Sequence, residues 1–187
     1  MARLPVVLGT LDLPLPELCA ARLDGELVVI GGGWCPVDEP DLPSLRAAAV
    51  APHGRGTLIV ERRSAAWVHG ALPAPPAVSE YCVPYADRST ARQDPACVVR
   101  EVAIDDDDVT VVGGIRCTTR QRTAYDLLRD ARASDDEASA IVGALLGDDP
   151  ELAEALRGRI ASAYRLPHKS RALARLDAAR GQPSLTR

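Results

Sequence analysis

Aromatic residues are scarce in this chain of 187 residues: they make up 3% of it, and phenylalanine is absent. The hydrophobic fraction is nevertheless 47%, so the core must be built mainly from valine, leucine, isoleucine and alanine. A chain of this length can bury a sizeable core as one domain, or as a small module joined to a larger one. Trp34 and Trp67 are therefore expected to act first as packing anchors.

Long apolar runs and paired cysteines are also missing. No run approaches the ~18 apolar residues of a membrane span, and the first residues lack the apolar segment of a secretory signal. The cysteines are odd in number and form no C-x-x-C pair, which favours small buried thiols in a reducing compartment; they are Cys19, Cys35, Cys82, Cys97 and Cys117. Three scattered histidines do not form a ligand motif. We expect a cytoplasmic protein without membrane contact, metal or other cofactor.

Lysine is nearly absent, with one residue against 21 arginines. The net charge of −4 hides an asymmetry, because residues 155–187 carry a net charge of +7 and residues 1–154 a net charge of −11. Such a dipolar chain could meet an acidic partner with its C-terminal part and a basic partner with its body.

Sequence motifs of common enzymes are missing as well. There is no G-x-S-x-G elbow, and the single lysine, Lys169, does not follow the glycines of a phosphate loop. The acidic run 105–108 lacks the alternation and the glycine of a calcium loop, so we expect it to be solvated. Restriction-type nucleases carry Glu-x-Lys on a strand, but here Glu101 is followed by Val102 and Ala103. The sequence thus predicts a protein that is not an enzyme, with a degenerate nuclease-like protein as an alternative.

Twelve of the fifteen prolines precede residue 100, which predicts strands and short helices in the first half and mainly helices in the second. Residues 16–24 begin with a proline and are followed by Gly25, which predicts a short helix. The two apolar runs around the glycines 31–33 predict a hairpin. A helix followed by a hairpin is the second half of a winged helix. Another short helix is expected from Pro43, and a buried helix around 65–68.

Further along, two strands are expected within 78–85 and 97–104. Two β-branched runs joined by Gly113 and Gly114 predict a tight hairpin. Helices are expected over 119–131, 134–146, 150–164 and 167–179. The predicted fold class is α/β (mixed α+β), with a degenerate winged-helix-like segment at 1–40, an α/β core with a small mixed sheet at 41–132 and a helical region at 133–187.

A polar block, residues 118–123, stands where the last predicted strand becomes a helix. Thr119 can cap that helix, and Arg122 can pair with Asp126 one turn later on the helix surface, where such a pair contributes little. Alternatively, the free N–H groups of the first turn could bind a phosphate with Arg120 and Arg122 beside it. Thr119, Arg120 and Arg122 are therefore candidate partner or phosphate contacts.

The final predicted helix carries Arg171 and Arg175, which are four residues apart and share a face, while Leu173 and Leu176 lie on another. This spacing predicts a basic stripe that points outward. The stripe is either a solvated face or a surface for phosphate or an acidic partner, so Arg171 and Arg175 are further candidate contacts.

Three segments in order resemble the AbiEi family of antitoxins and regulators. They read LDGELVVIGGGWCPVDEP, RRSAAWVHGALPAPP and VVGGIRCTTRQRTAYDLLR, and they span roughly residues 23–132. The resemblance implies an N-terminal winged helix that binds operator DNA, and a C-terminal domain that neutralises a nucleotidyltransferase-like toxin. It would make 16–24 the recognition helix and 27–37 the wing. The family's motif residues would fall on the core helix and the junction, at Ser64, Trp67, His69, Thr118, Thr119, Arg122, Thr123 and Asp126, and no catalytic role carries over.

The candidate recognition helix departs from that pattern, because Arg22 is its only base against Glu17 and Asp24, and phosphate contacts dominate DNA affinity. We therefore expect an antitoxin-like regulator that acts through contact with its cognate toxin protein, with binding of operator DNA as an additional role. The alternatives are a stand-alone DNA-binding transcriptional regulator that uses the basic C-terminal helices, or a degenerate nuclease-like protein.

Overall fold

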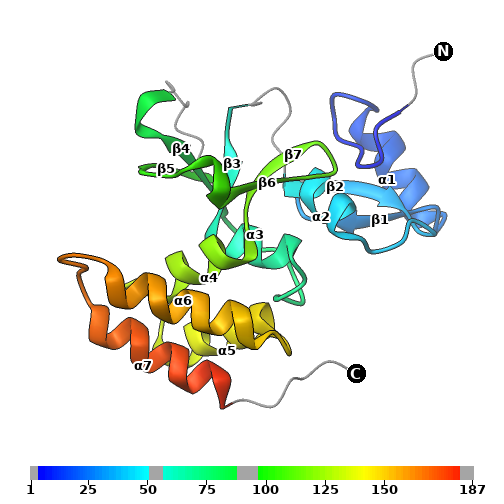
Figure 1. Cartoon of the computed structure of the whole chain (residues 1–187). Coiled ribbons are helices and arrows are strands. Elements are labelled where there is room, and N and C mark those ends of the chain that lie inside the picture. The colour runs from blue at the N-terminus through cyan, green and yellow to red at the C-terminus, as the bar shows by residue number, and fades with distance from the viewer. Residues whose placement is uncertain (1–3, 51–56, 88–96, 182–187) are drawn as a thin grey trace.

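The computed structural model describes residues 4–50, 57–87 and 97–181. Within these residues the chain has seven α-helices, a two-stranded sheet and a five-stranded sheet (Figure 1). It is thus a mixed α/β protein, which confirms the predicted fold class.

The N-terminal part consists of helix α1 (Leu15–Leu23) and the antiparallel strands β1 (Leu27–Ile30) and β2 (Gly33–Pro36). The predicted order of helix and hairpin is confirmed. Proline in the first turn starts α1, as expected where no N–H partner is needed. Leu18 is the buried residue of α1 and packs with Leu8 and Leu27. Cys35 of the hairpin packs in a separate cluster with Leu45 of helix α2 (Pro43–Val50), so the hairpin lies between α1 and α2.

The larger sheet has the strand order β5-β4-β3-β7-β6. Its strands are β3 (Ile59–Val60), β4 (Ser79–Pro84), β5 (Cys97–Val102), β6 (Val109–Val112) and β7 (Ile115–Thr118). Parallel pairs join β4 to β5 and β3 to β7, and antiparallel pairs join β3 to β4 and β6 to β7. The strands predicted within 78–85 and 97–104 are thus confirmed. Residues 88–96, between these two strands, lie outside the described part of the chain.

The hairpin β6–β7 turns at Gly113 and Gly114, as predicted from the sequence. Both residues have positive φ angles, 58° and 85°, which glycine adopts without steric cost. Gly113 also has no room for a side chain, because an added Cβ would lie 2.9 Å from the Cβ of Ser44 in α2. The glycine therefore lets the hairpin turn and lets α2 approach it closely.

Helix α3 (Arg62–Val68) lies between the sheet and the C-terminal helices. Ala65, Trp67 and Val68 pack into the cluster that includes the sheet residues Val60 and Tyr81. Ala66 instead belongs to the cluster of the C-terminal helices. A helix that is buried on both sides needs small residues where its neighbours approach, which explains the pair of alanines.

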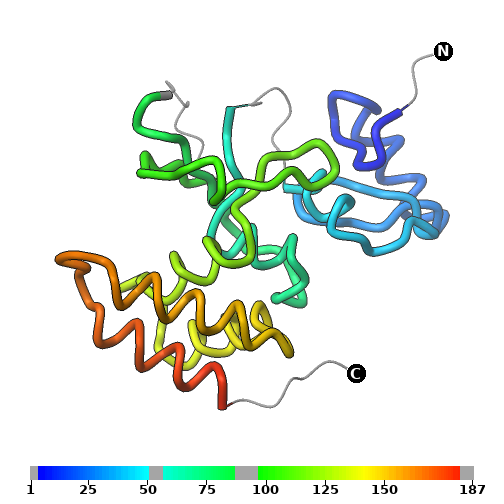
Figure 2. Tube along the Cα trace, in the orientation of Figure 1, coloured from blue at the N-terminus to red at the C-terminus, as the bar shows by residue number. Residues whose placement is uncertain are grey.

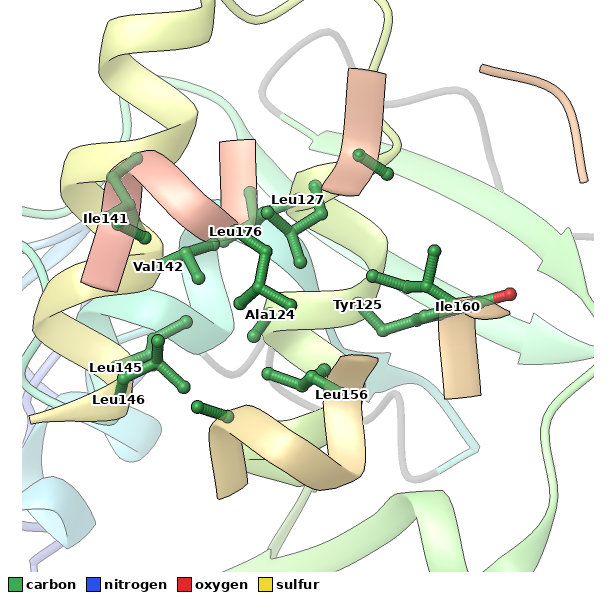
Figure 3. Close-up of a cluster of buried hydrophobic side chains, with 14 of the residues drawn as sticks. Ala124, Tyr125, Leu127, Ile141, Val142, Leu145, Leu146, Leu156, Ile160 and Leu176 are labelled. Atoms are coloured by element: carbon green, nitrogen blue, oxygen red, sulfur yellow. The ribbon is translucent and has the colours of Figure 1, made fainter. Parts of the chain in front are cut away.

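The C-terminal layer contains α4 (Arg120–Leu128), α5 (Asp135–Leu146), α6 (Pro150–Ser162) and α7 (Lys169–Arg180). Leu127, Leu145, Leu156 and Leu176 come from these four helices and converge in one core (Figure 3). This core crosses the predicted domain boundary at residue 132, because α4 packs with the helices that follow it.

The N-terminal segment and the C-terminal helices lie on different sides of the central sheet, as the trace of the chain shows (Figure 2). In the part of the chain that the structure describes, no helix has both the length and the apolar character that a membrane crossing requires.

Candidate functional site

The junction between β7 and α4 is capped by its own threonines. The hydroxyl of Thr119 accepts a hydrogen bond from the backbone N–H of Arg122 at 3.2 Å, which confirms Thr119 as the N-cap. The hydroxyls of Thr118 and Thr123 lie 2.7 Å apart and are both buried. His69 Nε2 lies 2.7 Å from the carbonyl oxygen of Thr118. Burial lowers the pKa of His69, so the neutral ring donates this hydrogen bond and ties α3 to the junction.

Arg122 does not lie on the helix surface. Its side chain and that of Asp126 are each 7% exposed, and Arg122 Nε donates to Asp126 Oδ2 at 2.9 Å. The same guanidinium donates to Asp108 Oδ2 at 2.6 Å and to the carbonyl oxygen of Ala103 at 2.9 Å. Arg122 and Asp126 thus form the expected i,i+4 pair, but the prediction that the pair is exposed is wrong, because Asp108 and the segment at Ala103 cover this face of α4.

Asp108 connects this pair to α6. Arg159 donates to both of its carboxylate oxygens, at 2.6 and 2.7 Å. Burial raises the pKa of Asp108, but the hydrogen bonds from Arg159 and Arg122 outweigh that effect and bring the pKa below its ordinary value. Residues 105–107 are exposed, as expected, whereas the prediction that Asp108 is solvated is wrong. Asp108 ends a short 3-10 helix, η2 (Asp106–Asp108), that turns this one carboxylate inward.

The same chain of charges continues toward the sheet. Arg100 Nε and Nη2 bind the two carboxylate oxygens of Glu61 at 2.6 and 2.5 Å, and Arg100 Nη2 lies 3.9 Å from Asp126 Oδ2. Burial raises the pKa of Glu61, although Arg100 opposes this. We call this set the arginine–carboxylate network; in order it consists of Glu61, Arg100, Asp126, Arg122, Asp108 and Arg159.

The network alternates three carboxylates with three guanidiniums, so its formal charge is zero. It links the start of α3, β5, α4, η2 and α6, which come from distant parts of the sequence. The ring of Tyr125 lies 4.5 Å from the Cζ of Arg159 and 4.8 Å from that of Arg129, in cation–π contact. A guanidinium that pairs with carboxylates on both sides is a positioning device, so the arrangement holds the sheet and the helical layer in one register.

Arg120, the other arginine of the polar block, serves a different helix. Its Nε donates to the carbonyl oxygen of Leu145 at 3.0 Å, and its Nη2 donates to that of Leu146 at 3.2 Å. These carbonyls end α5, where the last turn leaves oxygen atoms without intrahelical partners. Arg120 thus caps the C-terminus of α5 from the side.

The C-terminal arginines do not form an outward stripe. The side chain of Arg175 is 1% exposed, and its guanidinium donates to the carbonyl oxygens of Leu128, Asp130 and Ala133 at 3.0, 2.8 and 2.7 Å. The prediction that Arg175 faces outward is therefore wrong, because α7 packs this face against the end of α4. Arg171, which is partly exposed, shares a carboxylate oxygen of Asp135 with Arg175.

Further basic side chains of α6 and α7 also have partners within the fold. Arg157 pairs with Asp177, and Arg180 pairs with Glu154 at 2.8 Å. Lys169 donates to the carbonyl oxygen of Ala161 at 2.5 Å, in the last turn of α6. The net positive charge of this region is thus largely used to join its helices to one another and to the acidic body.

The N-terminal helix presents a different surface. Leu18 is its buried residue, while Leu15 and Leu23 are 50% and 88% exposed. Glu17 and Asp24 are exposed on the same helix and its C-cap. Leu11, just before the helix, is 81% exposed. This helix thus combines apolar and acidic groups at the surface.

Sequence reasoning identified Thr119, Arg120 and Arg122 as polar residues of interest but missed Glu61, Arg100, Asp108 and Arg159 as their companions. The partners in these ion pairs are 14 to 51 residues apart. A sequence signal for Arg100 is its place on the strand face that also carries Val98 and Val102.

The fold and the network define a mixed α/β protein in which a helix–hairpin segment is joined to a sheet and a four-helix layer. No protein-family model matches the chain, and no curated protein matches it either. Among solved structures, it is similar to the RV2827C protein from Mycobacterium tuberculosis, with a TM-score of 0.50 and 19% sequence identity. The match covers 96% of this chain and 73% of the other. At this level of identity the similarity describes the fold alone.

Proposed function

We propose that this chain is an antitoxin-like regulator that acts in the cytoplasm by binding a partner protein, and that the partner is a nucleotidyltransferase-like toxin. The observation that carries the proposal is the internal pairing of the polar junction residues. Thr119, Arg122 and Asp126, which carry the family resemblance, bond to groups of the same chain. Because these polar groups are already bonded within the chain, they support a structural role for the junction. We infer that the chain acts by contact between its surface and a partner protein.

A stand-alone DNA-binding regulator receives less support from the same contacts. Phosphate binding requires cations that are free to reach the duplex, but Arg175 is enclosed and Arg171 and Arg157 pair with aspartates. On α1, Arg22 is the single base. Repression of its own operon is therefore proposed only as an additional role of the complex.

A nuclease-like activity is also less well supported. In this interpretation, Asp108 and Glu101 would hold a divalent cation. Asp108 instead accepts three hydrogen bonds from two arginines, and Glu101 is exposed on β5. Incubation of the chain with Mg²⁺ or Mn²⁺ and plasmid DNA tests this directly. Cleavage that disappears in both Asp108→Ala and Glu101→Ala, but persists in Asp107→Ala, would establish the enzymatic alternative.

The experiment that tests the proposed function is co-expression with a nucleotidyltransferase-like toxin encoded beside this chain. We expect the chain to restore growth and to co-purify with the toxin. The control is Leu156→Asp, which places a charge in the core of the helical layer and should abolish rescue together with folding. A chain that is folded and abundant but neither restores growth nor associates with the toxin would contradict the proposal.

A further inference from the structure

Helix α1 has three sides with different chemistry. At 100° per residue, Leu15, Cys19 and Leu23 follow one another at intervals of four and lie on one side of the buried Leu18. All three are exposed. Because a helix of this length normally buries an apolar stripe against its own protein, an exposed second stripe on α1 indicates a surface for something else.

The acidic residues of α1 lie on the opposite side of Leu18. By the same helical spacing, Glu17 and Asp24 fall together there, and both are exposed. Among residues 1–40 there are six acidic and two basic residues, a net charge of −4. The exposed part of α1 is therefore an apolar stripe with an acidic edge on one side and the single base Arg22 on the other. We call the stripe and its acidic edge the α1 face: Leu15, Glu17, Cys19, Leu23 and Asp24.

The position of α1 leaves this face open. The helix packs through Leu18 on the hairpin, and the hairpin separates it from α2 and the sheet. In Figure 1, α1 lies at the outer edge of the molecule, on the side away from α4–α7. An occupant of the α1 face would therefore not have to displace another element of the described fold.

The negative charge of the α1 face indicates which kind of partner can bind there. A nucleic acid would bring phosphates toward Glu17 and Asp24, and like charges repel. A second copy of the chain would set one acidic edge against another. A protein segment with leucine-like side chains on one side and lysine or arginine beside them matches both parts of the face.

We propose that the α1 face docks a basic amphipathic helix of a partner protein. The inference rests on the proposed function in one respect, namely that the toxin is the protein that carries this helix. The apolar stripe supplies burial, and the acidic edge steers the basic helix and sets its orientation.

The test uses a defined probe and the full chain. The probe is a synthetic peptide of about 14 leucines and lysines in which the leucines recur at helical spacing; a peptide with glutamate in place of lysine is its control. We expect the chain to bind the lysine peptide and not the glutamate peptide in titration calorimetry. Binding should weaken as salt rises from ~50 to ~300 mM, because exposed charges are screened.

Matched variants place the binding on the α1 face. The variant Glu17→Lys with Asp24→Lys should weaken binding of the lysine peptide about tenfold or more. The control Asp107→Lys with Asp148→Lys makes the same change in net charge at two other exposed acids, and it should change the affinity less than about twofold. If both double variants lose affinity equally, or if the α1 variant binds like the unmodified chain, the docking proposal is wrong.

Leu23→Ser provides an independent check, because this residue is among the most exposed in the fold and its replacement should leave the melting temperature unchanged. It should weaken peptide binding at least threefold, by loss of apolar burial; unchanged affinity would count against the α1 face. Co-expression with the toxin separates the two proposals. If the unmodified chain and the α1 variant rescue growth equally, the docking proposal fails and the proposed function stands. If neither rescues growth while the peptide results hold, the α1 face stands and the proposed function fails.

Discussion

Replacement of Arg122 by alanine is the most direct test of the arginine–carboxylate network. The guanidinium of Arg122 bonds to Asp108, to Asp126 and to the carbonyl of Ala103. All three charged side chains are less than a tenth exposed. Removal of the arginine leaves two buried carboxylates with less compensation, and this costs about 3–5 kcal/mol when a buried pair is broken. The remaining contacts of Asp108 with Arg159 and of Asp126 with Arg100 favour the lower end, about 3 kcal/mol.

The loss can be measured by urea unfolding followed by circular dichroism. For an m-value of about 2 kcal/mol/M, a loss of about 3 kcal/mol lowers the midpoint by about 1.5 M. In a chain of this size the melting temperature should fall by roughly 6–12 °C. Arg132→Ala is the matched control, because Arg132 is 65% exposed and its replacement should cost less than about 1 kcal/mol.

A second variant tests the cause of the loss. Arg122→Met combined with Asp126→Asn removes one charge of each sign and keeps the volume similar. It should recover part of the stability that Arg122→Ala loses, since the penalty comes from unpaired buried charge. If Arg122→Ala costs no more than Arg132→Ala, the network does not contribute to stability and the argument from its burial is refuted.

Three further outcomes follow from other contacts. Thr119→Ala should lower the free energy of unfolding by about 0.5–2 kcal/mol through loss of the N-cap, and Thr119→Ser should recover most of it; an unchanged urea midpoint would refute the capping role. Arg175→Ala should cost about 3 kcal/mol, because several carbonyl oxygens lose a buried donor, whereas Arg171→Ala on the same helix face should cost under ~1 kcal/mol; equal midpoints would show that burial does not distinguish them. Burial lowers the pKa of His69 below 6.5, so the unfolded chain takes up a proton first as pH falls. Stability contributed by neutral His69 is complete above pH 6.5 and is lost below it; urea midpoints measured across this range should show a slope that His69→Gln reduces.

Local patterns in the sequence predicted most of the elements. The hairpin at Gly113 and Gly114, the cap at Thr119 and the four C-terminal helices are as expected. These features depend on backbone angles and on hydrogen bonds between residues a few positions apart. Such information is contained in a short segment, so it can be read without knowledge of what packs against it.

The sequence by itself therefore determined most of the secondary structure, the fold class and the acidic character of α1. Only the tertiary structure decided which charged side chains are buried. Arg122 and Arg175 lie at helical positions that local spacing alone cannot distinguish from an exposed face. Their burial depends on partners from other elements: Asp108 lies 14 residues from Arg122, and Leu128 at the end of α4 lies 47 residues from Arg175. A buried charge is stable only when oppositely charged or hydrogen-bonding partners are buried beside it. The packing of the whole chain decides whether such partners are present.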